Sequence, residues 1–267
     1  MPSQSVRSVR NYVSKLEKIV STAAIYPRDA NKVAFDSMAL QSISKGFALA
    51  RAVLLLIEKG FPDEAYGLSR SLVELCAGLR YITVDPDPNE KEKRTKEFIY
   101  YDETEQNYWL IQSRLYLSDP VLLQEIESSQ LAKDLDAKKL DPKAAYRHWS
   151  RYDRGFIPQV MKLDHPLDGA TNPLRQRGMA YAADYHGTSA YVHCSQRGLN
   201  NYFHDPAWVY AGDKRRSTCV DDTAPKALFI VCEYLHSILC YAFFGLNLHR
   251  PPEMGKLFGK VIVQFVK

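Results

Sequence analysis

Apolar residues recur every three or four positions along most of the chain, which is the spacing of one face of an α-helix. Over residues 35–57 the pattern is long, and Gly60 ends it because glycine readily takes the left-handed conformation that closes a helix. Pro62 and Asp63 open the next helix, whose apolar face runs to Ile82. The short connection predicts that these two helices form an antiparallel pair.

Helical patterns also fill most of the remaining chain. The expected helices cover residues 6–22, 91–117, about 120–133, 173–203 and 223–248. The tail at 254–267 contains VIVQFV, which fits a last helical turn, a lone strand or a dimer contact. No alternation of short β-branched runs with helices occurs, so a parallel sheet is not expected.

We therefore predict an all-α, single-domain helical bundle of about seven to ten helices. Residues 1–33 would form an N-terminal helix and linker, 34–248 the core bundle and 249–267 a C-terminal tail.

One apolar stretch, residues 227–248, is long enough to cross a membrane. Glu233, His236 and Asn247 interrupt it, and each polar group would be costly in lipid, so a buried core helix is the better interpretation. The N-terminal residues lack the apolar segment of a secretory signal, and the five cysteines follow no disulfide spacing. These features predict a cytoplasmic protein without membrane contact.

The net charge of +4, from 35 basic and 31 acidic residues, neither predicts nor excludes a nucleic-acid partner, because such binding depends on a clustered patch. Arg147, Arg151 and Arg154 lie close together in the most basic neighbourhood of the chain. Such a cluster is usually a solvated face, and its alternative role is to bind an anion.

The chain's polar residues with chemical potential gather in residues 173–203. If this stretch is one helix, His186, Ser189, His193 and Arg197 form a polar stripe along it. His186 and His193 are about 10 Å apart along the axis, too far for one metal ion. No Walker loop, GxGxxG, GxSxG or HExxH sequence occurs, so we expect neither a metal nor a cofactor.

Arg70 and Glu74 are four residues apart and flank the apolar face of their helix. They form either a solvent-exposed pair or a buried, hydrogen-bonded pair that faces another polar stripe, and local pattern does not decide between these.

Three motifs, in order, resemble the domain of unknown function 5677 family of bacteria: RSLVE at Arg70–Glu74, HWS at His148–Ser150 and YHGTSAYVHCS at Tyr185–Ser195. The last motif of that family typically has a tyrosine, a serine and a histidine, which match Tyr185, Ser189 and His193. Cys194 departs from the proline that often follows the histidine. The resemblance covers about residues 35–241 and implies an all-helical fold with no established activity.

Arg197 and His204 are separated by six residues, which resembles the loosest form of the signature of HEPN ribonucleases, an arginine followed by a histidine. Chance alone produces about one such match in this chain, and Gly198 stands where that family tends to have a polar residue.

Two function classes stay open. In the first, the protein binds a protein or small-molecule partner in a prokaryotic stress or phage-defence system, with a buried polar network that fixes helix packing. In the second, it is a metal-independent, HEPN-like nuclease that cleaves RNA, with His193 or His204 as acid or base and Arg197 stabilising charge. We favour the first because no complete catalytic set is visible. The residues assigned to binding are Arg70, Glu74, Tyr185, His186, His148, Arg147 and Arg151, and those assigned to catalysis are His193, Ser189, Arg197 and His204.

We also predict a homodimer. The aromatic helix at 91–117 and the VIVQFV tail carry more apolar surface than one small bundle readily covers, and two-fold pairing commonly buries such surface.

Overall fold

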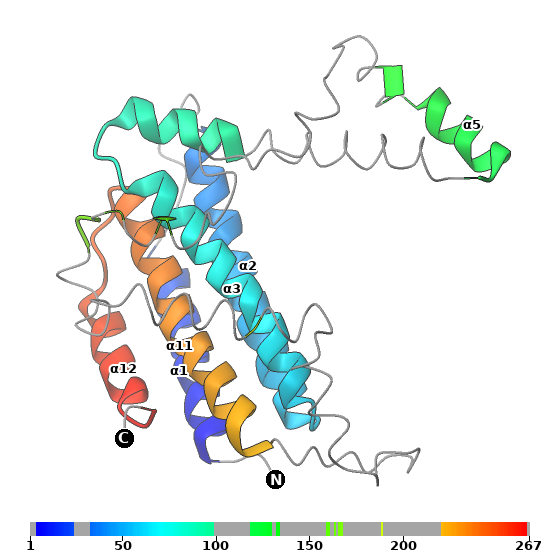
Figure 1. Cartoon of the computed structure of the whole chain (residues 1–267). Helices are drawn as coiled ribbons and strands as arrows, with labels where there is room; N and C mark the ends of the chain where they lie inside the picture. Colours follow the sequence, from blue (N-terminus) through cyan, green and yellow to red (C-terminus); the bar gives the residue numbers. More distant parts are fainter. Residues whose placement is uncertain are drawn as a thin grey trace, which may run out of the picture. The chain divides into compact units, whose positions relative to one another are not determined.

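The computed structural model describes residues 4–23, 33–98, 118–129, 132–133, 159–160, 163, 165–167, 188 and 220–265. These residues contain seven helices and no strand, which confirms the predicted all-α fold and helix number. The helices, drawn in Figure 1, are α1 (Gln4–Thr22), α2 (Val33–Glu58), α3 (Pro62–Thr83), a helix at 88–98, α5 (Pro120–Ser128), α11 (Val220–Gly245) and α12 (Pro252–Ile262).

The chain divides into two compact units. One consists of Met1–Pro86 together with Ile157–Lys267, and the other of Asp87–Phe156. The prediction of a single domain stays a prediction. The first unit holds α1, α2, α3, α11 and α12, whereas the helix at 88–98 and α5 belong to the second.

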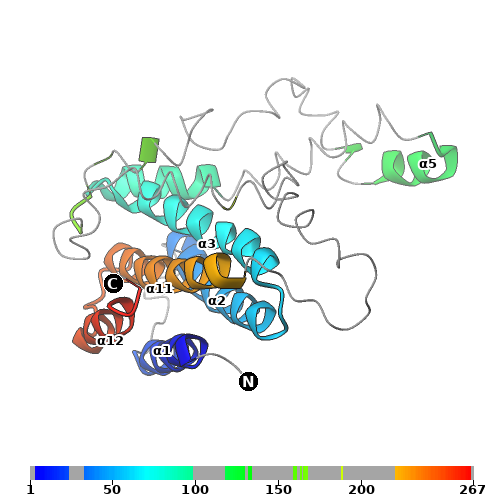
Figure 2. The ribbon, with the colours of Figure 1, turned by 60° about the horizontal axis from the view of Figure 1, so that its bottom comes forward.

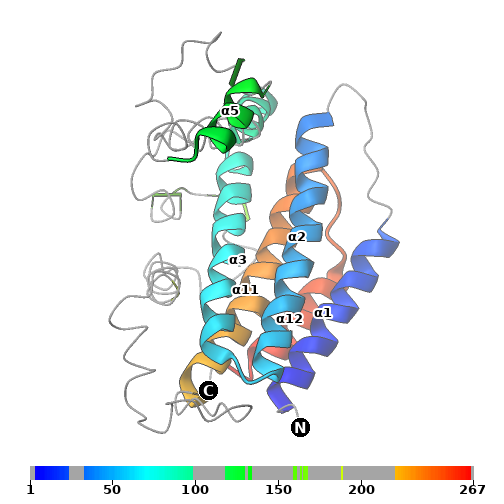
Figure 3. The ribbon, with the colours of Figure 1, turned by 90° about the vertical axis from the view of Figure 1, so that its right-hand side faces the viewer.

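Helices α2 and α11 form the middle of the first unit. Figure 2 shows them between α3 on one side and α1 with α12 on the other, and Figure 3 shows α2, α3 and α11 running alongside one another. The helices that the sequence pattern assigned to the N-terminal segment and the tail thus pack directly on the central helices.

The α2–α3 pair forms as predicted. Along α2, the apolar residues that mark the predicted face are buried from Phe35 to Leu54. Gly60 closes α2 with a φ of 85°, and the Phe61 amide donates to the Leu56 carbonyl over 2.9 Å. This six-to-one hydrogen bond satisfies a helix-end carbonyl and turns the chain directly into α3.

Helix α11 is the central core helix. It begins at Val220, earlier than the predicted start at Thr223, with Pro225 in its second turn. Asn247 ends the helical segment in the left-handed conformation, at φ 54°, and the Leu248 amide donates to the Phe243 carbonyl over 2.8 Å. The asparagine that interrupts the apolar pattern is therefore a helix-closing residue, because asparagine tolerates this conformation better than most residues.

Two helical segments, Ala34–Glu58 and Thr223–Gly245, have the length and hydropathy of a membrane span. Core helices of soluble proteins share these properties, and 89% of the Thr223–Gly245 window is buried inside the fold.

The C-terminal tail is helical, so the last-helical-turn interpretation of VIVQFV is the one that the structure bears out. Val261 and Ile262 are buried at the end of α12. Beyond α12, the ring of Phe265 meets that of Phe229 edge-on at 6.4 Å, and the Gln264 amide donates to the Ser8 hydroxyl over 3.2 Å. Four apolar residues of VIVQFV are described by the structure: Val261, Ile262, Val263 and Phe265. Among these four, only Val263 is strongly exposed, at 58%.

Gly245 marks the closest approach of α11 to its neighbours. A Cβ atom at this position would lie 2.1 Å from Cζ of Phe35 on α2 and 2.8 Å from Cγ2 of Thr83 on α3. Both distances are far below van der Waals contact, so the three helices meet here only because this residue has no side chain.

We predict that Gly245→Ala destabilises the fold by about 1 to 3 kcal/mol, because the added methyl group overpacks a closed core. Gly259→Ala is the matched control, since a Cβ at that position of α12 has nothing within 4 Å. The control should gain up to about 1 kcal/mol from helix propensity alone. Urea unfolding measures both changes, and equal stability of the two variants would contradict this account of the packing.

Candidate functional site

Arg70 and Glu74 are the predicted site residues that lie among the described residues. The Arg70 Nε donates to the Glu74 Oε1 over 2.7 Å, with exposed side-chain fractions of 16% and 46%. The carboxylate thus faces solvent, and a pair of this kind contributes a few tenths of a kcal/mol. The other predicted site residues lie outside the described residues: Tyr185, His186, Ser189, His193, Arg197, His204, His148, Arg147 and Arg151.

Thr188 is the described residue of the YHGTSAYVHCS motif. It is helical and fully buried. This agrees with the helix predicted over residues 173–203 at that position.

A buried arginine that the sequence analysis did not single out organises the first unit. Arg80, near the end of α3, is 2% exposed. Its guanidinium donates to the Tyr241 hydroxyl over 2.8 Å and to the backbone carbonyls of Val160, over 3.3 Å, and Leu163. One side chain therefore joins α3 to α11 and to Val160 and Leu163, which lie about 80 residues later in the sequence.

His165 extends this network and is held as one tautomer. Thr83 donates its hydroxyl proton to the Leu79 carbonyl over 2.7 Å, so its oxygen accepts from the His165 Nε2, 3.2 Å away. The Leu167 amide donates to the His165 Nδ1 over 3.0 Å. Nε2 therefore carries the proton, Nδ1 accepts, and the ring is neutral.

Aromatic packing closes the network. The His165 ring meets the rings of Tyr241 and Phe244 edge-on, at 4.7 and 5.3 Å, and the Arg80 guanidinium carbon lies 5.9 Å from the centre of the Tyr241 ring. These buried groups hydrogen-bond to one another and to backbone carbonyls. We name Arg80, Thr83, His165 and Tyr241 the arginine network, and its geometry is that of a structural anchor.

A second polar cluster lies on the other side of α11. Tyr12 of α1 is buried and donates to the Cys232 carbonyl over 3.4 Å. Burial holds the pKa of Tyr12 well above its usual value, and Cys232, Cys240 and Glu233 raise it further. Burial also raises the pKa of the Cys232 thiol, with Glu233 adding to the effect. Both groups therefore stay protonated at neutral pH.

The same cluster contains a cysteine with different neighbours. The Cys240 Sγ lies 3.5 Å from the His236 Nε2, one turn earlier on α11, and accepts from Nη1 of Arg250 over 3.5 Å. Phe258 of α12 stacks on the His236 ring with centres 4.3 Å apart and an interplanar angle of 13°. His236 was noted in the sequence only as an interruption of an apolar stretch.

A third buried polar group lies where α3 and α11 begin. Asp63 is 5% exposed, and Thr223 of α11 is hydrogen-bonded to its carboxylate. Burial raises the pKa of Asp63 above its usual value and the neighbouring Glu64 adds to this, while the hydrogen bond with Thr223 opposes both.

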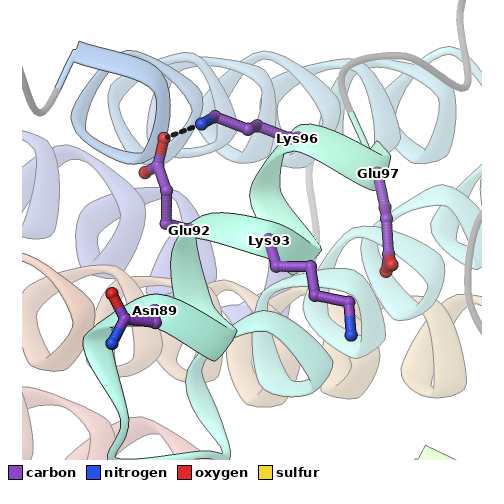
Figure 4. A pocket seen from close by; sticks show the side chains of 5 residues that line it. All are labelled: Asn89, Glu92, Lys93, Lys96 and Glu97. Carbon is purple, nitrogen blue, oxygen red and sulfur yellow. Dashed lines mark ion pairs between the residues drawn. The ribbon is translucent and has the colours of Figure 1, made fainter.

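No group of three or more potential metal ligands occurs among the described residues. In the second unit, the helix at 88–98 lines a hollow of about 470 Å³ with polar side chains, shown in Figure 4: Asn89, Glu92, Lys93, Lys96 and Glu97. Lys96 pairs with Glu92 at 3.3 Å, and the two lysines and two glutamates balance in charge. This lining selects no particular ligand charge.

The buried polar residues that the sequence analysis did not select have a weak signal in the sequence, because each one interrupts an apolar run. Arg80 stands inside the apolar run CAGLRYIT, and His236 and Glu233 stand inside the apolar stretch of α11. A polar residue in such a run must find partners when it is buried. The sequence cannot name those partners, because Arg80 bonds residues 80 to 161 positions away.

We predict that Asp63→Asn gains stability relative to wild type as pH rises from about 4 towards 7. A carboxyl group whose pKa is raised on folding contributes stability below its unfolded pKa and loses it as pH rises through the folded pKa. Asparagine cannot ionise and keeps an oxygen that accepts from Thr223, so it avoids this loss.

Glu253→Gln is the control, because Glu253 also lies in the first turn of a helix but is exposed. Urea unfolding at several pH values tests the pair, and a difference between Asp63→Asn and wild type that stays flat from pH 3 to 7 would contradict the burial cost assigned to Asp63.

Comparison with known proteins gives one match. Searches of curated proteins and of solved structures return no significant match. A protein-family model, described as a family of unknown function (DUF5677), matches residues 36–207, which is more than half of the chain. The matched range includes all of α3 with Arg70, Glu74 and Arg80. The chain therefore belongs to the DUF5677 family of unknown function.

Proposed function

We propose that this chain is an interaction protein that binds another protein through helix α5. The observation that carries the proposal is the exposure of α5. None of its residues is buried, and Val121 and Leu122 are exposed to 66% and 45%. Exposed apolar side chains on one short helix are costly in water and are typical of a surface that a partner covers.

Local interactions favour the start of α5. Asp119 caps its N-terminus, because its Oδ1 accepts from the amides of Val121, over 2.9 Å, and Leu122, over 3.3 Å. Pro120 occupies the first helical position, where its missing amide proton costs no hydrogen bond. These interactions favour the helical form of α5 before a partner binds, which lowers the entropy cost of binding.

Three of the four aliphatic residues of α5 form a stripe with an acidic border, and Val121 lies outside this stripe. At 100° per residue, Leu122, Leu123 and Ile126 fall within one arc, and Glu125 and Glu127 lie on its two sides. With Asp119, residues 118–129 carry a charge of −3 and no basic residue.

The negative charge of α5 determines which kind of partner it can bind. An acidic border repels nucleic-acid phosphates and anionic lipid, and it disfavours the pairing of α5 with α5 of a second copy. The fitting partner is a protein with an apolar groove bordered by lysine and arginine, which receives an amphipathic helix. The predicted homodimer would use a different surface.

As in the sequence-based hypothesis, we place this interaction protein in the cytoplasm, as part of a prokaryotic stress or phage-defence system. A protein that recruits a partner through an exposed helix suits this setting without needing catalysis of its own.

We predict that a photo-crosslinking amino acid at Leu122 captures a partner protein in growing cells, whereas the same group at Gln124, on the opposite side of α5, does not. The peptide crosslinked to position 122 should come from an apolar groove with basic residues beside it. Replacing Glu125 and Glu127 with lysine should reduce capture by about tenfold or more, since like charges then face each other.

Three results would overturn the proposal. These are capture of a second copy of this chain at position 122, equal capture at positions 122 and 124, and capture that survives the charge reversal. Cleavage of total RNA by the purified protein, lost in His193→Ala, would instead support the nuclease alternative.

A further inference from the structure

The two cysteines of the cluster between α1, α11 and α12 lie on one helix in opposite environments. Cys232 is buried beside Glu233, and both effects raise its pKa. Eight residues later, the sulfur of Cys240 touches two nitrogen groups, the His236 Nε2 and the Arg250 Nη1, each at 3.5 Å. A thiol beside a histidine and an arginine is in the setting that favours a thiolate.

The partners of Cys240 have distinct roles. Arginine only donates and keeps its charge, so Arg250 stabilises negative charge on the sulfur. Histidine can accept the thiol proton at Nε2, and the face of the Phe258 ring, stacked at 4.3 Å, suits the cation that results. The other ionisable groups of the cluster are Glu233 and Tyr12, and burial keeps Tyr12 protonated.

Cys240 is buried, but one of the side chains that contact its sulfur reaches the surface. Cys240 is 2% exposed, but Arg250, which contacts its sulfur, is partly exposed and belongs to the connection between α11 and α12. Asn247 and His249 of the same connection are exposed. A small oxidant would therefore approach the sulfur from this connection.

We propose that Cys240 is a modification site, a thiol that His236 and Arg250 activate for oxidation by hydrogen peroxide. The thiol proton passes to the Nε2 atom of His236, and the thiolate attacks one peroxide oxygen. The O–O bond breaks, the sulfur is oxidised to a sulfenic acid, and the leaving hydroxide takes the proton from His236 to form water. The added oxygen displaces Arg250 and loosens the connection that holds α12 against α11.

The test treats the whole wild-type protein with hydrogen peroxide, traps sulfenic acids with dimedone and measures each cysteine by peptide mass spectrometry. Cys240 should be trapped about ten times faster than Cys232, because only the thiolate reacts and only Cys240 has groups that stabilise it. Alkylation by iodoacetamide should follow pH with a midpoint lower for Cys240 than for Cys232. A rate for Cys240 no higher than that for Cys232 would overturn the proposal.

Arg250→Met separates activation from simple access. Methionine is shorter than arginine and carries no charge, so a rate set by access alone should rise in this variant. If Arg250 activates the thiol, trapping at Cys240 should instead fall about tenfold. Arg250→Lys should restore part of the rate. Circular dichroism establishes that each variant is folded, and the wild-type comparison stands independently if one is not. A folded Arg250→Met variant with the wild-type rate, or a faster one, would contradict the role of Arg250.

Discussion

The buried guanidinium of Arg80 is the constraint on which the first unit depends. A charge that is 2% exposed is stable only when its donors meet acceptors, because removing a charged group from water costs several kcal/mol. Those acceptors come from α11, through Tyr241, and from the carbonyls of Val160 and Leu163. The buried charge on α3 is therefore satisfied only when Val160 and Leu163 lie against it, which links residues far apart in the sequence into one folded unit.

Much of the helical framework follows from local physics. The apolar period of α2, the closing Gly60 and the opening Pro62 act within a few residues, so their pattern predicts both helices and the turn between them. The same holds for α5, where Asp119 and Pro120 mark the start. The pattern does not predict how much of each helix is buried. It assigned one apolar face to α3, whereas α2 and α11 bury that helix on several sides.

The polar anchors could not be predicted in the same way, because their partners are distant in sequence. Arg70 and Glu74 were predicted to pair because they are four residues apart, and the Glu74 side chain is 46% exposed. The arginine that the core encloses is Arg80, ten residues later. The stripe proposed at His186, Ser189, His193 and Arg197 lies outside the described residues and stays a prediction. Buried polar groups next to α11 thus serve packing at Arg80 and, in our proposal, chemistry at Cys240.

The central claim is that Arg80 holds Val160 and Leu163 against α3 and α11, and hydrogen exchange in Arg80→Met tests it most directly. Loss of the guanidinium leaves buried carbonyls without their donor, so the amides of Leu163 and Leu167 should exchange about a hundredfold faster or more. The Phe61 amide, bonded at the far turn between α2 and α3, should change much less. Arg51→Met, which removes an exposed arginine paired with Glu17, is the control. Unchanged protection at Leu163 and Leu167 in a folded Arg80→Met protein would contradict the account.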